Sequence, residues 1–337
     1  MIEPVTVPMS DRTRVGQARQ LSSRLAREIG FVSEDERRLL LVVTELATNI
    51  LRHAVNGFLV VQALTEAGAM GIEVVSVDTG PGMADTDSQL EDGVSTDGGL
   101  GSGLGTARRL SDEFFIDSQP GRGTIVVART WLDHAAGGRP RWSLAGGLTL
   151  PAPGEVVSGD AWTCVSTGDR ATIMVADGLG HGPNAAEASR VAVALLREHP
   201  DAEPGELLRR VHQGLRGTRG AAVAIARLDR AARLVRFAGL GNVGGVICGG
   251  GRQTTLLSHF GTAGQEAKTI RELPYPWTPG AAIVLRSDGV SSRWTANGAS
   301  GAESLHPTVL AATLIRALRN QADDATVAVL ASSRDAT

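Results

Sequence analysis

Gly98-Gly99-Leu100-Gly101-Ser102-Gly103-Leu104-Gly105-Thr106-Ala107-Arg108-Arg109-Leu110 is a glycine-rich stretch that runs directly into helix-forming residues. Its glycines leave backbone N–H groups uncovered by side chains. The N-terminus of the following helix adds unpaired donors and the positive end of the helix dipole. Proteins hold phosphate groups with this combination, so the stretch indicates a nucleotide site if its neighbours supply the remaining parts.

The length and composition of the chain indicate a globular protein of two domains. Its 337 residues exceed the usual size of a single domain. Hydrophobic residues make up 42% and charged residues 20%, and the formal net charge is -3. A weakly acidic chain gives no electrostatic reason to bind nucleic acid or an anionic membrane, so neither partner is expected.

The two cysteines, Cys164 and Cys248, each lie in an apolar, strand-like run. This placement favours small buried side chains in a reducing compartment over a disulfide framework. The first residues show no signal-peptide pattern, and no apolar run approaches membrane-spanning length. We therefore expect a cytoplasmic protein. The histidines show no paired ligand spacing, so a zinc site is not expected.

Two amphipathic helices are predicted near the N-terminus. The first extends from about residue 15 to Gly30, and the second begins at a capping box formed by Ser33 and Glu36. On the second helix Glu45 and Asn49 are four residues apart and therefore adjacent, beside the apolar stripe. Such a pair on its own is most often a solvated polar edge.

A β-prone run over residues 71–77 ends in Asp78-Thr79-Gly80-Pro81-Gly82-Met83. This ending is compatible with a simple turn. The alternative is an adenine site, because a carboxylate can accept a hydrogen bond from the exocyclic amine while bare backbone lets the ring approach. A helix over 104–113 and a strand over 123–131 are predicted to complete the α/β layer.

The motifs of residues 12–132 resemble the GHKL (Bergerat-fold) ATP-binding family. Its Glu-x-x-x-Asn box matches Glu45 and Asn49. The later boxes match Asp78, Gly80 and Gly82; then Gly99, Gly101, Gly103 and Gly105; and finally Gly123-Thr124. More narrowly, the region is similar to the RsbT type of bacterial switch kinase, which phosphorylates a serine on STAS-domain proteins of the stressosome.

This resemblance implies an α/β sandwich with helices on one mixed sheet, and ATP with Mg²⁺ as cofactor. Asn49 would hold the Mg²⁺, Glu45 would accept the proton of the serine hydroxyl, and Asp78 would select adenine. The sequence offers no helix with a phospho-acceptor histidine, so a His-Asp relay is not expected. The other implied nucleotide-binding residues are Gly80, Gly82, Gly99, Gly101, Gly103, Gly105 and Thr124.

A short, small and polar segment after residue 132 separates this region from a different architecture, so we place domains at 1–134 and 140–337. Short β-prone runs and grouped helices favour a sandwich of antiparallel sheets covered by helices. The predicted helices cover 183–198, 204–216 and 307–319. The predicted strands cover 155–157, 161–165, 171–176, 221–228, 233–238, 243–248, 281–285 and 326–330.

Aspartates recur beside small residues at the ends of these strands: Asp160, Asp177, Asp288 and the pair Asp323-Asp324. A single Asp-Gly is usually a turn. Several carboxylates at one end of a sandwich would repel one another unless cations lay between them. Oxygen ligands without His or Cys favour Mg²⁺ or Mn²⁺.

The order of these motifs over residues 142–333 resembles the SpoIIE/RsbX branch of the PPM metal-dependent serine/threonine phosphatases. The resemblance implies an αββα sandwich with two Mn²⁺ or Mg²⁺ ions. Asp177 would bridge both ions, the Gly178 carbonyl would bind one, and Asp288 and Asp323 would complete the other. Asp160 would belong to both the metal site and the catalytic residues by orienting the attacking water. The basic phosphate-binding residue of the larger phosphatases has no clear counterpart here.

We therefore predict a fusion of a serine kinase and an opposing phosphatase, both acting on STAS-type switch proteins, with a downstream sigma-factor regulator as a further partner. Two alternatives stay open. In the first, only the phosphatase is active and the N-terminal domain senses ATP, although intact Glu45 and Asn49 argue against a pure sensor. In the second, the N-terminal domain is a non-catalytic module that sequesters a sigma factor or switch protein.

Overall fold

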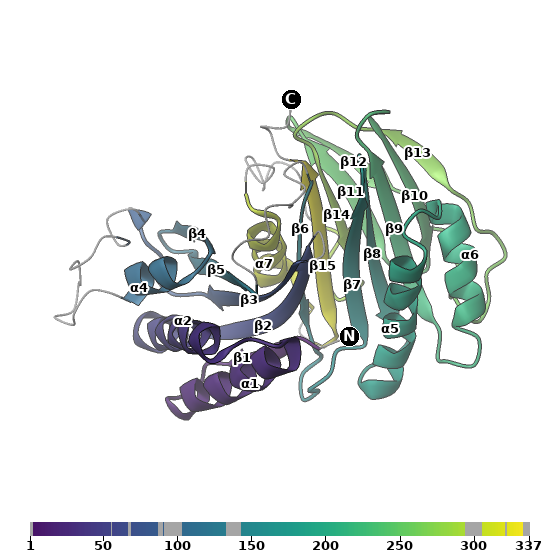
Figure 1. Cartoon of the computed structure of the whole chain (residues 1–337). Coiled ribbons are helices and arrows are strands. Elements are labelled where there is room, and N and C mark those ends of the chain that lie inside the picture. The colour runs from purple at the N-terminus through teal and green to yellow at the C-terminus, as the bar shows by residue number, and fades with distance from the viewer. Residues whose placement is uncertain are drawn as a thin grey trace. The chain divides into compact units, whose positions relative to one another are not determined.

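The structure is a computed structural model that describes residues 3–54, 56–66, 69–86, 90, 103–132, 143–293, 305–320 and 322–332. The chain divides into two compact units, Met1–Arg139 and Pro140–Thr337 (Figure 1). Among the described residues, none of the helices has the length and apolar character needed to cross a membrane.

The first unit is built on one five-stranded sheet in the order β1-β2-β3-β5-β4. Every described pairing in it is antiparallel, so the expectation of a mixed sheet is corrected. Hairpins join β2 to β3 and β4 to β5, which accounts for two of these pairings because a hairpin forces antiparallel pairing. The elements are β1 Val5–Pro8, α1 Thr13–Ile29, α2 Ser33–His53, β2 Gly57–Glu66, β3 Ala69–Asp78, α4 Gly103–Leu110, β4 Glu113–Gln119 and β5 Gly123–Trp131.

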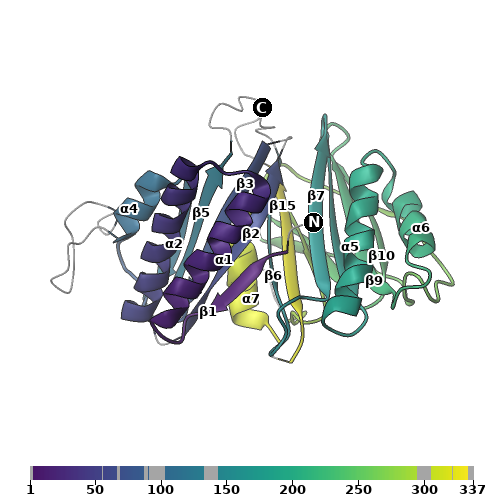
Figure 2. The same cartoon turned by 60° about the horizontal axis from the view of Figure 1, so that its bottom comes forward.

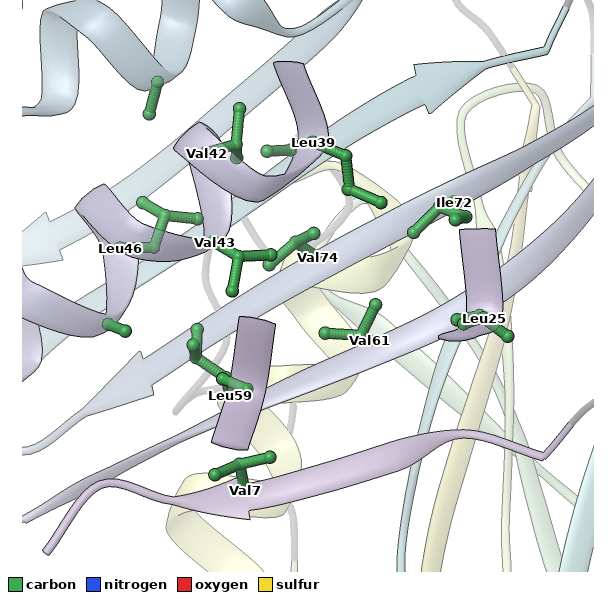
Figure 3. Packing of buried hydrophobic residues seen from close by; sticks show 14 of the residues in the cluster. Val7, Leu25, Leu39, Val42, Val43, Leu46, Leu59, Val61, Ile72 and Val74 are labelled. Carbon is green, nitrogen blue, oxygen red and sulfur yellow. The ribbon is translucent and has the colours of Figure 1, made fainter. Parts of the chain in front are cut away.

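The core of this unit lies between the helices and one face of the sheet. The apolar stripe of α2 contributes Leu39, Val43 and Leu46, which are at most 1% exposed. Figure 3 shows these side chains over strand residues such as Val61 and Val74. Burying this stripe fixes the rotation of α2 about its axis, and its half-buried edge then carries Glu45 and Asn49.

The ends of the first two helices agree only in part with the sequence pattern. Helix α1 ends as predicted at Gly30, which has a left-handed φ of 99°. The predicted capping box is wrong, because α2 begins at Ser33 and its N-cap residue makes no side-chain cap. Glu36 instead accepts hydrogen bonds from Ser23 and Arg27 of α1. A tertiary contact between the helices has therefore replaced the local one.

Helix α4 is shorter than the predicted 104–113, because its last residue is Leu110. Arg38 of α2 donates to the Leu110 carbonyl at 3.1 Å and pairs with Asp112 at 3.2 Å. The other Asp112 oxygen accepts from the backbone N–H of Trp131 at 2.7 Å. These contacts connect the end of α4 to α2 and β5, and α4 ends three residues earlier than the sequence pattern predicts.

The second unit stacks two five-stranded antiparallel sheets, in the orders β13-β10-β9-β8-β7 and β12-β11-β14-β15-β6. Helices α5 and α6 cover the first sheet and α7 covers the second, as expected for an αββα sandwich (Figure 2). Its elements are β6 Ser143–Leu150, β7 Asp160–Thr167, β8 Arg170–Gly178, α5 Pro183–Glu198, α6 Pro204–Gly214, β9 Ala221–Asp229, β10 Leu234–Leu240, β11 Gly244–Gly249, β12 Arg252–Leu256, β13 Leu273–Pro276, β14 Ala282–Arg286, α7 Pro307–Leu318 and β15 Ala325–Ser332.

Apolar residues fill the space between the two sheets, for example Phe237, Ile173 and Leu285, all fully buried. Neither cysteine forms a disulfide; Cys248 is buried and Cys164 is half-buried. The predicted strand at 155–157 is wrong, because these residues belong to the loop before β7. Glu155 does not pair in a sheet. Its Oε1 atom lies 2.6 Å from Nδ1 of His181, which is in the loop before α5.

Candidate functional site

The first candidate site brings Glu45 and Asn49 of α2 against the N-terminal end of α4. A Cβ atom on Gly103 would lie 3.1 Å from Asn49 Oδ1 and 3.2 Å from Glu45 Oε2. The absence of a side chain at Gly103 therefore lets the helix N-terminus approach both polar groups. The amide nitrogen of Asn49 is buried and has no hydrogen-bond acceptor among the described residues. A buried donor without a partner is costly, and a phosphate oxygen would satisfy it.

Asp78 ends β3 and organises the loop that follows it. Its Oδ1 accepts hydrogen bonds from the backbone N–H groups of Gly80 at 2.7 Å and Thr124 at 3.1 Å. The Thr124 hydroxyl is 2.8 Å from the Ser118 hydroxyl on β4. Asp78 therefore joins the loop to β5, in addition to any contact that it makes with a ligand.

The glycines of this loop are required because backbone segments cross closely. A Cβ on Gly82 would lie 2.0 Å from the Gln119 carbonyl oxygen, and one on Gly123 would lie 2.1 Å from that of Asp78. A Cβ on Gly80 would lie 2.8 Å from the carbonyl oxygen of His53, at the end of α2. The Asp-x-Gly-x-Gly sequence is thus more than a turn, because it packs the Asp78 loop against the helix that carries Asn49.

The structure accounts for only part of the second glycine box. Gly103 begins α4 and Gly105 is buried within it, whereas Gly99 and Gly101 lie outside the described residues. Arg52, one turn beyond Asn49, is exposed on α2. The described residues therefore bring together Glu45, Asn49 and Gly103, and join the Asp78 loop to the end of the same helix.

The second candidate site lies at one end of the sandwich, where four strands present carboxylates. Asp160 and Asp177 are opposite each other in the register of β7 and β8. Asp288 follows β14, and it is close enough to Asp177 for its charge to raise the pKa of that carboxyl. Asn242, in the loop after β10, donates its amide N–H to Asp288 Oδ2. Asp323 directly precedes Asp324 at the start of β15.

Glycines beside these aspartates again mark close approaches of backbone. A Cβ on Gly178 would lie 2.1 Å from the Ala185 carbonyl oxygen, and one on Gly289 would lie 1.8 Å from that of Asp324. Neither glycine has a positive φ. Asp177-Gly178 ends strand β8, whereas Asp288-Gly289 occupies a turn in which the Val290 N–H donates to the Ser287 carbonyl at 3.3 Å. Packing between neighbouring segments requires the glycine in both pairs, so the turn alternative holds for Asp288-Gly289 but is not the whole explanation.

The crowding of the carboxyls changes their acidity. Burial, followed by the charges of Asp160 and Asp288, raises the pKa of Asp177 to about 9. Burial also raises the pKa of Asp160 to about 7, although a hydrogen bond with Ser287 acts in the opposite direction. The pKa of Asp288 is raised by burial and then by the charge of Asp323. Without counter-charges, this end of the unit resists full ionisation.

Asp324 differs from the others because its oxygens are already engaged. Oδ1 accepts from the Ala152 N–H at 2.7 Å, and Oδ2 accepts from the Gly159 N–H at 2.9 Å. These bonds hold the two ends of the loop before β7 and so position Asp160. Asp324 thus supports the site, whereas the Oδ2 atoms of Asp160 and Asp177 are buried and have no hydrogen-bond partner among the described residues.

The described ranges contain no group of three or more His, Cys, Asp and Glu side chains arranged as a ready-made metal cage. The donor chemistry nevertheless fits Mg²⁺ or Mn²⁺, since the unpartnered atoms of Asp160 and Asp177 are hard carboxylate oxygens. Sequence reasoning missed Asn242 and Ser287 as parts of this site. Their position inside the Gly-Asn-Val-Gly-Gly and Ser-Asp-Gly motifs was the available signal.

Comparisons with known proteins agree with this division into two sites. Residues 9–130 match the family described as histidine kinase-like ATPase domain. Over 115 residues the chain is 41% identical to serine/threonine-protein kinase RsbT of Bacillus subtilis (strain 168), covering 34% of this chain and 86% of that protein. The chain belongs to the RsbT family through its first unit. The matched region of the chain includes the motifs that contain Glu45, Asn49 and Asp78.

The second unit matches a different family. Residues 167–332 match stage II sporulation protein E (SpoIIE), so an RsbT-like, histidine kinase-like ATPase domain is joined to a region similar to SpoIIE. A solved chain described as "The bacterial stressosome: a modular system that has been adapted to control secondary messenger signaling" is 26% identical, with a TM-score of 0.53. The similarity covers 56% of this chain and 98% of that one.

Proposed function

We propose that this RsbT-like protein is a bifunctional partner-switching regulator. Its first unit transfers a phosphoryl group from ATP to a serine of a STAS-domain switch protein, and its second unit hydrolyses phosphoserine on such a protein. The kinase relative and the stressosome neighbour support this choice of target. The observation that carries the kinase proposal is the contact of Glu45 and Asn49 with Gly103 at the start of α4.

In the first unit the protein's contribution is to position the reactants and balance charge. Asn49 Oδ1 would hold the Mg²⁺ that accompanies ATP, and the ion would neutralise negative charge on the phosphates. The unpartnered amide nitrogen of Asn49 donates to a phosphate oxygen, and the N-terminus of α4 adds its dipole. Glu45, on the same face one turn earlier, accepts the proton of the incoming serine hydroxyl. Asp78 accepts from the adenine amine.

In the second unit Asp160, Asp177, Asp288, Asp323 and the Gly178 carbonyl would hold two Mg²⁺ or Mn²⁺ ions. These ions would supply the positive charge that activates water at neutral pH and stabilises the transferring phosphoryl group. The role of the protein is to keep the carboxylates close in spite of their repulsion. Asp324 positions Asp160 by accepting hydrogen bonds from both ends of the loop before β7, and Asn242 positions Asp288 by donating a hydrogen bond to its carboxylate.

The decisive experiment incubates the purified full chain with γ-labelled ATP, Mg²⁺ and candidate STAS-domain proteins. The expected result is label on a serine of one candidate, followed by its release as inorganic phosphate when Mn²⁺ is added and ATP is removed. Release without prior labelling by this chain would support a phosphatase with an ATP-sensing domain. Stable binding of a sigma factor or switch protein with neither reaction would support the sequestering module. Either outcome would refute the bifunctional proposal.

The role of Gly103 gives a prediction for the first unit. Gly103→Val is expected to lower phosphoryl transfer about 100-fold, because the new side chain displaces Asn49 and Glu45, and misplacement of reacting groups by about 1 Å has an effect of this size. Transfer rate and calorimetric ATP affinity are measured together. Gly16→Val in α1 is the matched control, since a Cβ there meets nothing within 4 Å. Equal losses in the two variants would mean that helix propensity, rather than the site, is responsible.

A further inference from the structure

The carboxylate end of the second unit poses an electrostatic problem for the substrate of the proposed phosphatase. A phosphate monoester carries close to two negative charges at neutral pH. It must approach an end of the sandwich that already holds Asp160, Asp177, Asp288 and the pair Asp323-Asp324. Bound cations offset part of this charge, but a fixed cationic side chain at the rim would also orient the phosphate.

Two arginines near this end are already engaged by backbone carbonyl groups. Arg286 donates from Nη1 to the carbonyl of Val290 at 2.7 Å and to that of Ser287 at 3.3 Å. Arg319 donates from Nη2 to the carbonyls of Pro151 and Asp323. Burial lowers the pKa of both guanidinium groups, as expected for partly desolvated structural cations. Both side chains therefore hold loops together.

Arg219 is placed differently. Its Nη1 atom lies 3.1 Å from the position that a Cβ on Gly180 would occupy, three residues after Asp177. Hydrogen bonds fix the backbone of Arg219 and of the following residue, Gly220. The Leu179 N–H donates to the carbonyl of Gly220 at 3.0 Å, and the Gln265 side chain donates to the carbonyl of Arg219 itself.

The guanidinium of Arg219 is exposed, and it makes no hydrogen bond or ion pair with any residue that the structure describes. Its anchored backbone thus presents a free cation beside the loop that leaves the carboxylate end. Gly180 has a φ of 87° and no side chain, so it leaves room for the guanidinium next to the chain that continues from Asp177 and Gly178.

We propose that Arg219 binds the phosphate group of the phosphoserine substrate. A guanidinium presents paired N–H donors in a planar fork that matches two phosphate oxygens, and charge-assisted bonds of this kind are stronger than neutral ones. This inference rests on the proposed phosphatase function. It assigns the basic phosphate-binding role, which had no counterpart near the start of this domain, to a residue between α6 and β9.

The test compares Arg219→Ala, Arg219→Lys and the control Arg216→Ala in the full chain. Arg216 is an exposed arginine three residues earlier in the same connection. The probe is p-nitrophenyl phosphate with Mn²⁺, because it needs no knowledge of the protein target, and inorganic phosphate serves as the competing product. Initial rates give KM and kcat, and the inhibition constant of phosphate is measured for each variant.

Arg219→Ala is expected to raise KM and the inhibition constant of phosphate about tenfold or more, as the loss of a charge-assisted hydrogen bond implies. The lysine variant should recover part of the effect, and Arg216→Ala should match the wild type. Wild-type KM and phosphate inhibition in Arg219→Ala would overturn the assignment while leaving the phosphatase proposal intact. An inactive wild-type chain would instead refute the phosphatase proposal. Thermal melting of Arg219→Lys and Arg219→Ala separates lost binding from lost folding.

Discussion

Asp177→Asn is expected to abolish phosphatase activity and, in the absence of divalent cations, to raise the thermal stability of the second unit. Activity should fall about 1,000-fold or more, because the substitution removes the carboxylate placed between Asp160 and Asp288 and with it the charge that holds the cations. Stability should rise because an amide is neutral at every pH. The variant thus distinguishes the effect of the Asp177 carboxylate on thermal stability from its effect on phosphatase activity.

The direction of the pH effect follows from the acidity of Asp177. Its pKa is raised to about 9 in the folded protein, far above the value of about 3.9 expected for an unfolded chain. The folded state therefore binds the proton more tightly. Protonation of Asp177 therefore stabilises the folded state. This contribution to the free energy of unfolding is complete below the unfolded pKa and is lost as the pH rises toward 9. Asp177→Asn should therefore gain more in Tm over the wild type at pH 8 than at pH 5.

The measurements are phosphate release and thermal melting at both pH values, with chelator and with Mn²⁺. Mn²⁺ should raise the Tm of the wild type but have little effect on Asp177→Asn. Asp169→Asn is the matched control, because Asp169 is an exposed residue in the turn at the opposite end of the β7–β8 hairpin. A metal-free Tm that is lower for Asp177→Asn than for the wild type at pH 8 would contradict the repulsion argument.

The sequence predicted elements well where a single periodicity decides the structure. The apolar stripe of α2 has the period of a helix and is buried, so the helix and the adjacency of Glu45 and Asn49 could be predicted from spacing alone. The central strands β8, β9 and β15 were predicted from a different signal, because each is a short, β-prone and nearly continuous apolar run bounded by turns. Buried regular elements are therefore predictable locally.

The failures concern features that depend on distant residues. Ser33 and Glu36 have capping-box spacing, but Glu36 finds Ser23 and Arg27 on another helix. Residues 155–157 are β-prone, but Glu155 is held in a loop by His181. In each case the side chain makes a tertiary hydrogen bond in place of the local structure predicted, and the local preference amounts to only a few tenths to about 1 kcal/mol. Such contacts cannot be derived from spacing.

The candidate sites show the same division. The residue types and their order indicated a nucleotide site and a metal site, because chemistry restricts which side chains can serve. The supporting contacts were not predictable. The close approach of Gly103 to Asn49 and the clamping of two N–H groups by Asp324 depend on where separate segments meet in space. Arg219 was missed for the same reason, since its relevance comes from its position beside Gly180.

Glu45→Gln is expected to leave ATP binding intact and to lower phosphoryl transfer to a STAS-domain protein about 100-fold to 10,000-fold, the range found when a general base is lost. The amide preserves the shape of the side chain that contacts the start of α4, but it cannot accept the proton of the serine hydroxyl. The Glu45 carboxylate suits this role because it is half-buried beside Asn49 and makes no hydrogen bond or ion pair with any described residue. No structural contact among those residues is therefore lost in the variant.

The matched control is Glu34→Gln in the first turn of the same helix, where an exposed carboxylate pairs, among the residues that the structure describes, only with the neighbouring Arg37 at the surface. It should transfer phosphate at the wild-type rate, because a surface ion pair contributes little. ATP affinity is measured by calorimetry and transfer by single-turnover labelling, so binding and chemistry are read separately. Transfer at the wild-type rate in Glu45→Gln would remove Glu45 from the reaction, since no other change to the site accompanies the loss of basicity. Loss of ATP binding together with transfer would instead make Glu45 a binding residue, whose carboxylate acts on the nucleotide rather than on the serine.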